Sequence, residues 1–160
     1  MWLRSVRTVP SNAGALVAAL GRLTPDVLAS LAEAASHDGC HLRASLATPV
    51  QRDEITTFHL RWWHDRERSL TPALDGELAL RPRGPDSTEL AITARYRCRE
   101  RLRELANTMF LRRLGEAVVA TFLDSLVQMV SGSMTIASAG HSTAQIPQPL
   151  PSTSARTTEP

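Results

Sequence analysis

The chain has 160 residues, of which 42% are hydrophobic and 21% are charged, as in an ordinary globular domain. This length suits one domain whose core folds without disulfides or structural metals, and the net charge of +2 is too small to indicate nucleic-acid binding by itself. The two cysteines, Cys40 and Cys98, allow at most one bridge, and we expect free thiols in a cytoplasmic protein. No apolar run reaches the ~18 residues that a membrane-spanning helix needs, so we expect no membrane span.

The first forty residues predict one strand followed by two short helices. Residues Trp2–Val9 mix β-branched and apolar residues with Arg, which favours a strand. Asn12 is a natural N-cap for a short helix that Gly21 can end. Thr24 caps a second helix, whose first turn accepts a proline, and the turn at Asp38 closes it.

The middle of the chain predicts four further strands, about five in total, because apolar and polar residues alternate with a period of two. Phe58, Leu60 and Trp62 share one face of their strand, and His59 lies on the other face. Alternation of this kind indicates an antiparallel sheet with one face on a core. The predicted strands are His41–Ala47, Glu54–Trp63, Ala73–Arg81 and Thr88–Cys98, with turns at Pro49–Asp53 and Gly84–Ser87.

The period changes to three or four from about Glu100 to Val130, which predicts one long amphipathic helix. Such a helix must cover an apolar surface, and the inner face of the sheet is the available one. Residues 131–160 are rich in Ser, Thr and Pro, with few charges, and we expect a disordered tail there. The predicted apolar stripe of the helix contains Leu102, Leu105, Ala106, Met109, Phe110, Leu114, Ala117, Val118, Thr121, Phe122, Ser125, Leu126 and Met129.

Several segments carry a resemblance to a known superfamily. The chain from Trp2 to Val130 resembles the SRPBCC or START-like proteins, which have the helix-grip fold and include polyketide cyclases, birch-pollen-allergen-like proteins and lipid-transfer domains. Several of its segments look like actinobacterial members of that group. The resemblance implies an α+β domain over residues 1–130, in which a curved antiparallel sheet wraps around the C-terminal helix. The segments that carry it are Pro72–Leu78, Arg81–Leu90, Ala94–Arg97, Arg61–Trp62, Leu111–Leu114 and Phe122–Leu123.

The resemblance also implies a cavity between the sheet and the long helix, able to bind a lipid, a polyketide or another apolar small molecule. The alternative is that the same side chains simply fill a core. No cofactor is implied, and no residue is assigned a catalytic role. The residues expected to line the cavity are Phe58, Leu60, Trp62, Leu78, Leu90, Ile92, Tyr96, Met109, Phe110, Ala117, Val118 and Phe122.

Two other functions stay open at this point. His59 and Tyr96 could serve as acid and base in a cyclase or dehydratase, although the alternation places His59 opposite Phe58. A ridge of arginines could bind nucleic acid or an acidic partner, or could be an exposed face with salt bridges to Asp75, Glu77 and Glu89. This ridge contains Arg95, Arg97, Arg99, Arg101 and Arg103, with Arg112 and Arg113 from the helix.

A metal site is not expected. His37, Cys40 and His41 lie close together in the sequence, but a zinc site needs three or four converging ligands. No second Cys or His pair with metal-binding spacing follows. The sequence does not specify the ligand, the oligomeric state or whether a reaction is catalysed.

Overall fold

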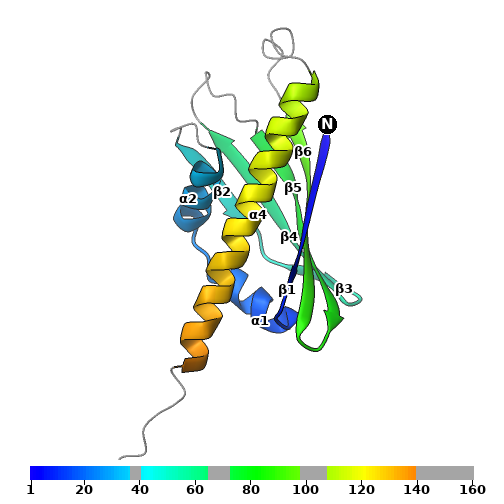
Figure 1. The fold of residues 1–160 in the computed structure, drawn as a ribbon, viewed down its shortest axis with the longest axis vertical. Helices are drawn as coiled ribbons and strands as arrows, with labels where there is room; N and C mark the ends of the chain where they lie inside the picture. The colour runs from blue at the N-terminus through cyan, green and yellow to red at the C-terminus, as the bar shows by residue number, and fades with distance from the viewer. Residues whose placement is uncertain (37–40, 65–72, 98–107, 140–160) are drawn as a thin grey trace, which may run out of the picture.

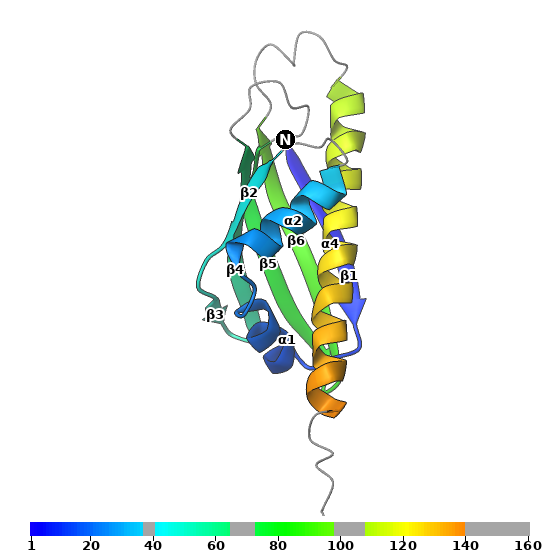
Figure 2. The same ribbon diagram turned by 90° about the vertical axis from the view of Figure 1, so that its left-hand side faces the viewer.

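A computed structural model describes residues 1–36, 41–64, 73–97 and 108–139. In this part of the chain, three helices cover one face of a single six-stranded antiparallel sheet (Figures 1 and 2). The core lies between that face and the helices. The elements are β1 (Trp2–Val9), α1 (Ala13–Leu20), α2 (Pro25–Ser36), β2 (Leu42–Leu46), β3 (Val50–Arg52), β4 (Ile55–His64), β5 (Ala73–Gly84), β6 (Ser87–Arg97) and α4 (Thr108–Ala139).

The sheet has the strand order β1-β6-β5-β4-β2, with β3 added to β4 beyond the end of β2. The first strand therefore closes the sheet beside the last one, and β1 pairs with β6 from Trp2 opposite Arg95 to Val9 opposite Thr88. The alternation predicted from the sequence is confirmed, since Phe58, Leu60 and Trp62 are buried on the inner face.

Local signals in the sequence position the two short helices. The Asn12 side chain accepts a hydrogen bond from the Ala15 amide at 2.8 Å, and helix α1 ends at Gly21. The Thr24 hydroxyl accepts from the Val27 amide at 3.4 Å and begins α2. Glu33 of α2 accepts from the Leu42 amide at 2.8 Å, so α2 is tied to the edge strand β2.

The long helix α4 crosses the covered face of the sheet, as Figure 1 shows. Its contact face is offset from the predicted stripe. Met109 and Phe110 are 62% and 60% exposed, and Ala117 is exposed as well, so the prediction that these three residues face the sheet is wrong. Between residues 109 and 132 of α4, where burial is described, the buried residues are Leu111, Gly115, Val118, Val119, Phe122, Leu123, Leu126 and Val130.

The buried face of α4 also packs against β1. A Cβ atom added to Gly115 would lie 2.9 Å from the Leu3 Cδ1 atom, so the Leu3 side chain packs closely on α4 at the residue without a side chain. The segment Met109–Gly132 is long and apolar enough to span a membrane. In this fold its buried face packs on the sheet, as in the core helix of a globular domain.

Two predicted boundaries differ from the structure. The expected turn at Pro49–Asp53 contains the short strand β3, which raises the strand number from about five to six. Helix α4 continues to Ala139, so residues 131–139 are helical and the expected tail cannot begin at 131. The expected helix start at Glu100 and the rest of the expected tail, 140–160, lie outside the described residues.

An ion pair joins the edge strand β1 to α4. The Arg7 guanidinium donates from Nε to Asp124 Oδ1 at 2.5 Å and from Nη2 to Asp124 Oδ2 at 3.0 Å. The side-chain hydrogen bond from Arg7 holds the pKa of the Asp124 carboxyl below its ordinary value. The two side chains are 40% and 48% exposed, so solvent screens much of this attraction.

Replacing Asp124 with Asn should therefore lower the free energy of unfolding at pH 7 by about 1 kcal/mol or less, the range of exposed ion pairs. A carboxyl whose pKa is lowered in the folded state stabilises the fold above its unfolded pKa of about 4. That contribution falls as the pH drops through the folded pKa. The difference between wild type and Asp124→Asn, measured by urea unfolding, should shrink toward zero below about pH 4.

A matched control is available on the same helix. Arg112 and Glu116 form an exposed pair one turn apart, with Nε–Oε1 at 2.9 Å, and Glu116→Gln should cost only about 0.3–0.5 kcal/mol. If the effect of Asp124→Asn were equally large at pH 7 and below pH 4, the ion pair would not be its cause.

Candidate functional site

The residues predicted to line a cavity are largely the packed core. On the sheet, Phe58, Leu60, Trp62, Leu78, Leu90 and Ile92 are buried, and Val118 and Phe122 meet them from α4. Met109, Phe110 and Ala117 do not join this set. Tyr96 lies on β6, but its side chain is outside the described residues. The structure therefore brings eight of these residues into one cluster, and their contact with a ligand stays a prediction.

Trp62 carries an unusual feature of this core. Its ring meets the Phe122 ring edge to face, with centroids 4.4 Å apart. Among the buried side-chain polar atoms of the described residues, only the Trp62 Nε1 has no hydrogen-bond partner. A buried donor without a partner costs about 1–3 kcal/mol. Trp62 is therefore held in place by its packing and not by polar contacts.

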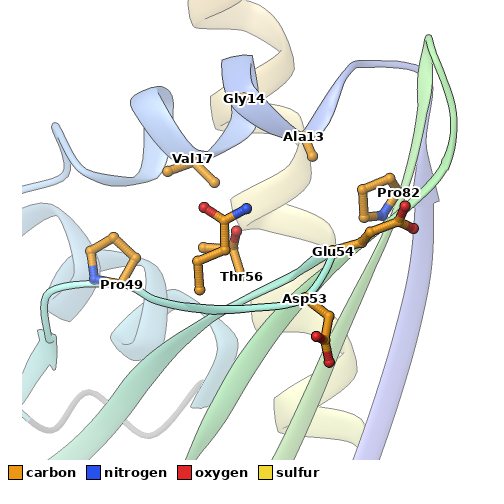
Figure 3. Close-up of a pocket in the computed structure, with 9 residues that line it drawn as sticks. Ala13, Gly14, Val17, Pro49, Asp53, Glu54, Thr56 and Pro82 are labelled. Carbon is orange, nitrogen blue, oxygen red and sulfur yellow. The ribbon is translucent and has the colours of Figure 1, made fainter.

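A hollow lies at the end of the inner sheet face, below α1 (Figure 3). It has a volume of about 520 Å³, within the size range of small-molecule sites. Figure 3 shows Ala13 and Val17 of α1 facing Pro49 and Thr56 across it. The full lining is Ala13, Gly14, Val17, Pro49, Gln51, Asp53, Glu54, Thr56 and Pro82.

The hollow is a continuation of the inner face. Thr56 precedes Phe58 by two residues on β4, and Pro82 follows Leu80 by two residues on β5, so both side chains point to the same side as the core. Gln51 of β3 lies opposite Thr56 and shares its face. Core side chains therefore cover the inner face beneath α4. The hollow lies on the part of this face between α1 and the β3–β4 hairpin.

The hairpin that forms the floor of the hollow turns through a left-handed residue. Asp53 has φ 54°, a conformation that Asp and Asn adopt more readily than most residues. In Figure 3 its carboxylate points away from α1, while the Glu54 carboxylate lies beside Pro82. Because no Arg, Lys or His belongs to the lining, the polar part of the hollow offers oxygen atoms and the Gln51 amide.

The sequence did not indicate this hollow. None of its lining residues was among the predicted ligand contacts, and Pro49–Asp53 was interpreted only as a turn. The available signal was the alternation on β4, which extends inward from Phe58 to Thr56. The position of α1 over the hairpin carries no sequence motif.

The face of the sheet that points away from the helices, called the convex face below, carries charged side chains. His59 Nε2 lies 2.8 Å from Asp75 Oδ1, and Arg61 Nε lies 3.9 Å from Asp75 Oδ2. The Arg61 guanidinium also sits 5.9 Å from the centre of the exposed Trp63 ring. The prediction that His59 points away from the core is confirmed, so His59 cannot act on a ligand bound on the inner face.

The arginine ridge is only partly described. Arg95 lies opposite Asp75 in the register of β5 and β6. Arg83 hydrogen-bonds to Glu89 and holds the pKa of that carboxyl below its ordinary value. The side chain of Arg97 and the residues Arg99, Arg101 and Arg103 lie outside the described part of the chain, so the partner-binding alternative stays untested.

No group of three or more metal-ligating side chains occurs within residues 1–36, 41–64, 73–97 and 108–139. His37 and Cys40, two of the three clustered residues in the sequence, lie outside these ranges. The arrangement offers no metal chemistry to build on.

A curved antiparallel sheet, two short helices after its first strand and a long C-terminal helix across its inner face define the helix-grip fold. The chain is similar to two solved bacterial structures. TTHA0849 from Thermus thermophilus shares 12% identity over 83% of this chain and 99% of that chain, with a TM-score of 0.51. A conserved protein from Geobacillus kaustophilus shares 10% identity over 81% and 95%, with a TM-score of 0.54.

A lower TM-score of 0.46 relates the chain to the Zhui aromatase/cyclase from Streptomyces sp. R1128, at 13% identity over 84% of this chain and 93% of that chain. The sequence matches no protein-family model and no curated protein sequence. At these identities the likeness to the Thermus and Geobacillus structures establishes the fold alone.

Proposed function

We propose that the protein binds a small molecule with an apolar body in the hollow below α1. The observation that carries this proposal is a space of about 520 Å³ that continues the inner sheet face outside the packed core. Sites for small molecules commonly have about 300–1,000 Å³, mostly apolar walls and a few polar groups. Ala13, Val17, Pro49 and Pro82 supply such walls here.

The lining also bears on the charge of the ligand. A carboxylate or phosphate head group would meet Glu54 without a compensating Arg or Lys in the lining. We therefore expect the ligand's polar end to be neutral or cationic, able to hydrogen-bond to Gln51, Glu54 or Thr56. Free fatty acids and anionic phospholipids fit this lining poorly.

No observation favours the cyclase or dehydratase alternative. It requires two polar groups that converge beneath α4. Thr88 is the buried polar residue of the described core, and its hydroxyl donates to the Ser11 carbonyl at 2.7 Å. Its hydrogen bond holds the start of β6 against the turn after β1, which is a structural role.

Filling the hollow should abolish the binding of a neutral apolar probe. Val17→Phe adds a ring at a lining position, and we expect the affinity for N-phenyl-1-naphthylamine, followed by its fluorescence, to fall about tenfold or more. Ala18→Phe is the matched control, because Ala18 is the next residue of α1, is exposed and does not belong to the lining.

Each outcome of this experiment is informative. Weaker binding in Val17→Phe with unchanged binding in Ala18→Phe supports the hollow as the site. Equal affinities in the wild type and in both variants, with unchanged melting temperatures, would place the probe elsewhere and overturn the proposal.

A further inference from the structure

A second hollow lies on the opposite, convex face of the sheet and is separate from the proposed site. Its volume is about 350 Å³. It is built where the connection from β2 to β3 folds back over β4, and the Ala47 amide donates to the His59 carbonyl at 2.9 Å to fix that connection. Its lining is Ala47, Thr48, Val50, Arg52, Thr57, His59 and Glu77.

The register of the sheet explains why these residues meet. Thr57 and His59 are the outward-facing residues of β4, Val50 lies opposite Thr57, and Glu77 of β5 lies opposite His59. The side chains of directly opposed residues on one face are neighbours. His59 and Glu77 are therefore neighbours, and the apolar side chain of Val50 lies on the same surface of the sheet.

The lining carries opposite charges that do not neutralise each other. In the part of the chain that the structure describes, neither Arg52 nor Glu77 pairs with another charged side chain. Arg52 lies opposite Ile55 on β4, whereas Glu77 lies opposite His59. Their Cα atoms are separated by about 13 Å along the strands and about 10 Å across them, or about 16 Å in all. Both side chains line the same hollow, so a small molecule bound there can reach the two charges only where Arg52 and Glu77 extend toward each other.

The remaining lining supplies orientation and apolar contact. His59 is held by Asp75 through its Nε2 atom at 2.8 Å, so the imidazole has a fixed direction beside Glu77. Val50 is one of the few large hydrophobic side chains left exposed, at 55%, and forms the apolar wall with Ala47.

We propose that this hollow binds a free α-amino acid with an apolar side chain. Its carboxylate would pair with Arg52, its ammonium group with Glu77, and its side chain would cover Val50. A balanced pair of charges in the lining favours a zwitterion over an anion or a cation of the same size, because either of these would leave one lining charge without a partner.

The test compares three probes of nearly equal shape by calorimetry or by NMR shifts of the His59 ring. L-Leucine has both charges, 4-methylpentanoate lacks the ammonium group, and 3-methylbutylamine lacks the carboxylate. We expect leucine to bind about tenfold or more tightly than either analogue, since each analogue lacks one of the two charge-assisted hydrogen bonds.

Three variants assign the binding to this hollow. Arg52→Gln and Glu77→Gln should each weaken leucine binding about tenfold and leave the melting temperature unchanged, because both residues are exposed. Arg81→Gln is the control, since Arg81 is an exposed arginine of β5 on the same convex face but outside the lining. It should bind leucine as the wild type does.

The proposal is overturned if leucine shows no saturable binding at millimolar concentrations, or if it binds no better than its two analogues. It is also overturned if Arg52→Gln and Glu77→Gln bind leucine as tightly as the wild type. None of these outcomes bears on the binding of N-phenyl-1-naphthylamine to the inner hollow or on its loss in Val17→Phe. The two proposals can therefore fail independently.

Discussion

Replacing Gly76 with Ala should destabilise the protein by about 3 kcal/mol or more, at or above the upper end of overpacking effects. Gly76 lies on β5, on the inner face between Leu74 and Leu78, opposite Leu60 on one side and Ala94 on the other. A Cβ atom there would lie 2.4 Å from the Ala94 Cα and 2.4 Å from the Thr93 oxygen. Both are backbone atoms, so the sheet itself would have to move.

The same substitution at the end of the strand provides the control. Gly84 has no atom within 4 Å of an added Cβ, and Gly84→Ala should change the free energy of unfolding by no more than about 0.5 kcal/mol. Urea unfolding of both variants measures the difference. Equal stabilities of Gly76→Ala and Gly84→Ala would show that β5 and β6 are not packed as closely at Gly76 as the structure has them.

Local rules account for most of the fold. Strand alternation places Phe58, Leu60 and Trp62 on the inner face, and the caps at Asn12 and Thr24 begin both short helices. These signals are local, because each depends on residues that are close in the sequence. The short strand β3 was missed because three exposed residues show no burial pattern from which to infer it.

The rotation of α4 about its axis could not be predicted from local sequence signals. Apolar residues occur on more than one face of this helix, since Met109, Phe110 and Ala117 are exposed while Leu111, Val118 and Phe122 are buried. The buried face is the one that contacts β1 and the sheet, as at Gly115 and Leu3, and these two residues are far apart in the sequence. Contacts between residues far apart in the sequence therefore determine which face of α4 is buried, and the periodicity of apolar residues alone does not.

Both hollows depend on long-range arrangements as well. The inner one needs α1 above the β3–β4 hairpin, and the convex one needs the β2–β3 connection above His59 and Glu77. Neither contains a sequence motif with fixed spacing. What the sequence did predict was the face of the sheet on which each residue of β4 lies, which is the property that separates Thr56 in one hollow from Thr57 in the other.

Replacing Phe122 with Ala should cost about 3–5 kcal/mol, the range for deleting a buried aromatic ring. Phe122 is 0% exposed and its ring packs edge to face on Trp62 at 4.4 Å, so its loss leaves a cavity in the core between α4 and the sheet. Since domains are stable by only about 5–15 kcal/mol, this change removes a large part of the total.

Phe110→Ala is the matched control, because it makes the same chemical change on the same helix at a ring that is 60% exposed. It should shift the unfolding free energy by about 0.5 kcal/mol or less. Thermal and urea unfolding, followed by Trp fluorescence, distinguish the two, since Trp62 loses its neighbour only in Phe122→Ala. A large loss of unfolding free energy in Phe110→Ala, with a small one in Phe122→Ala, would mean that the opposite face of α4 packs on the sheet. The rotation of α4 about its axis, which the sequence alone assigned incorrectly for Met109, Phe110 and Ala117, is therefore decided by two substitutions of one residue type.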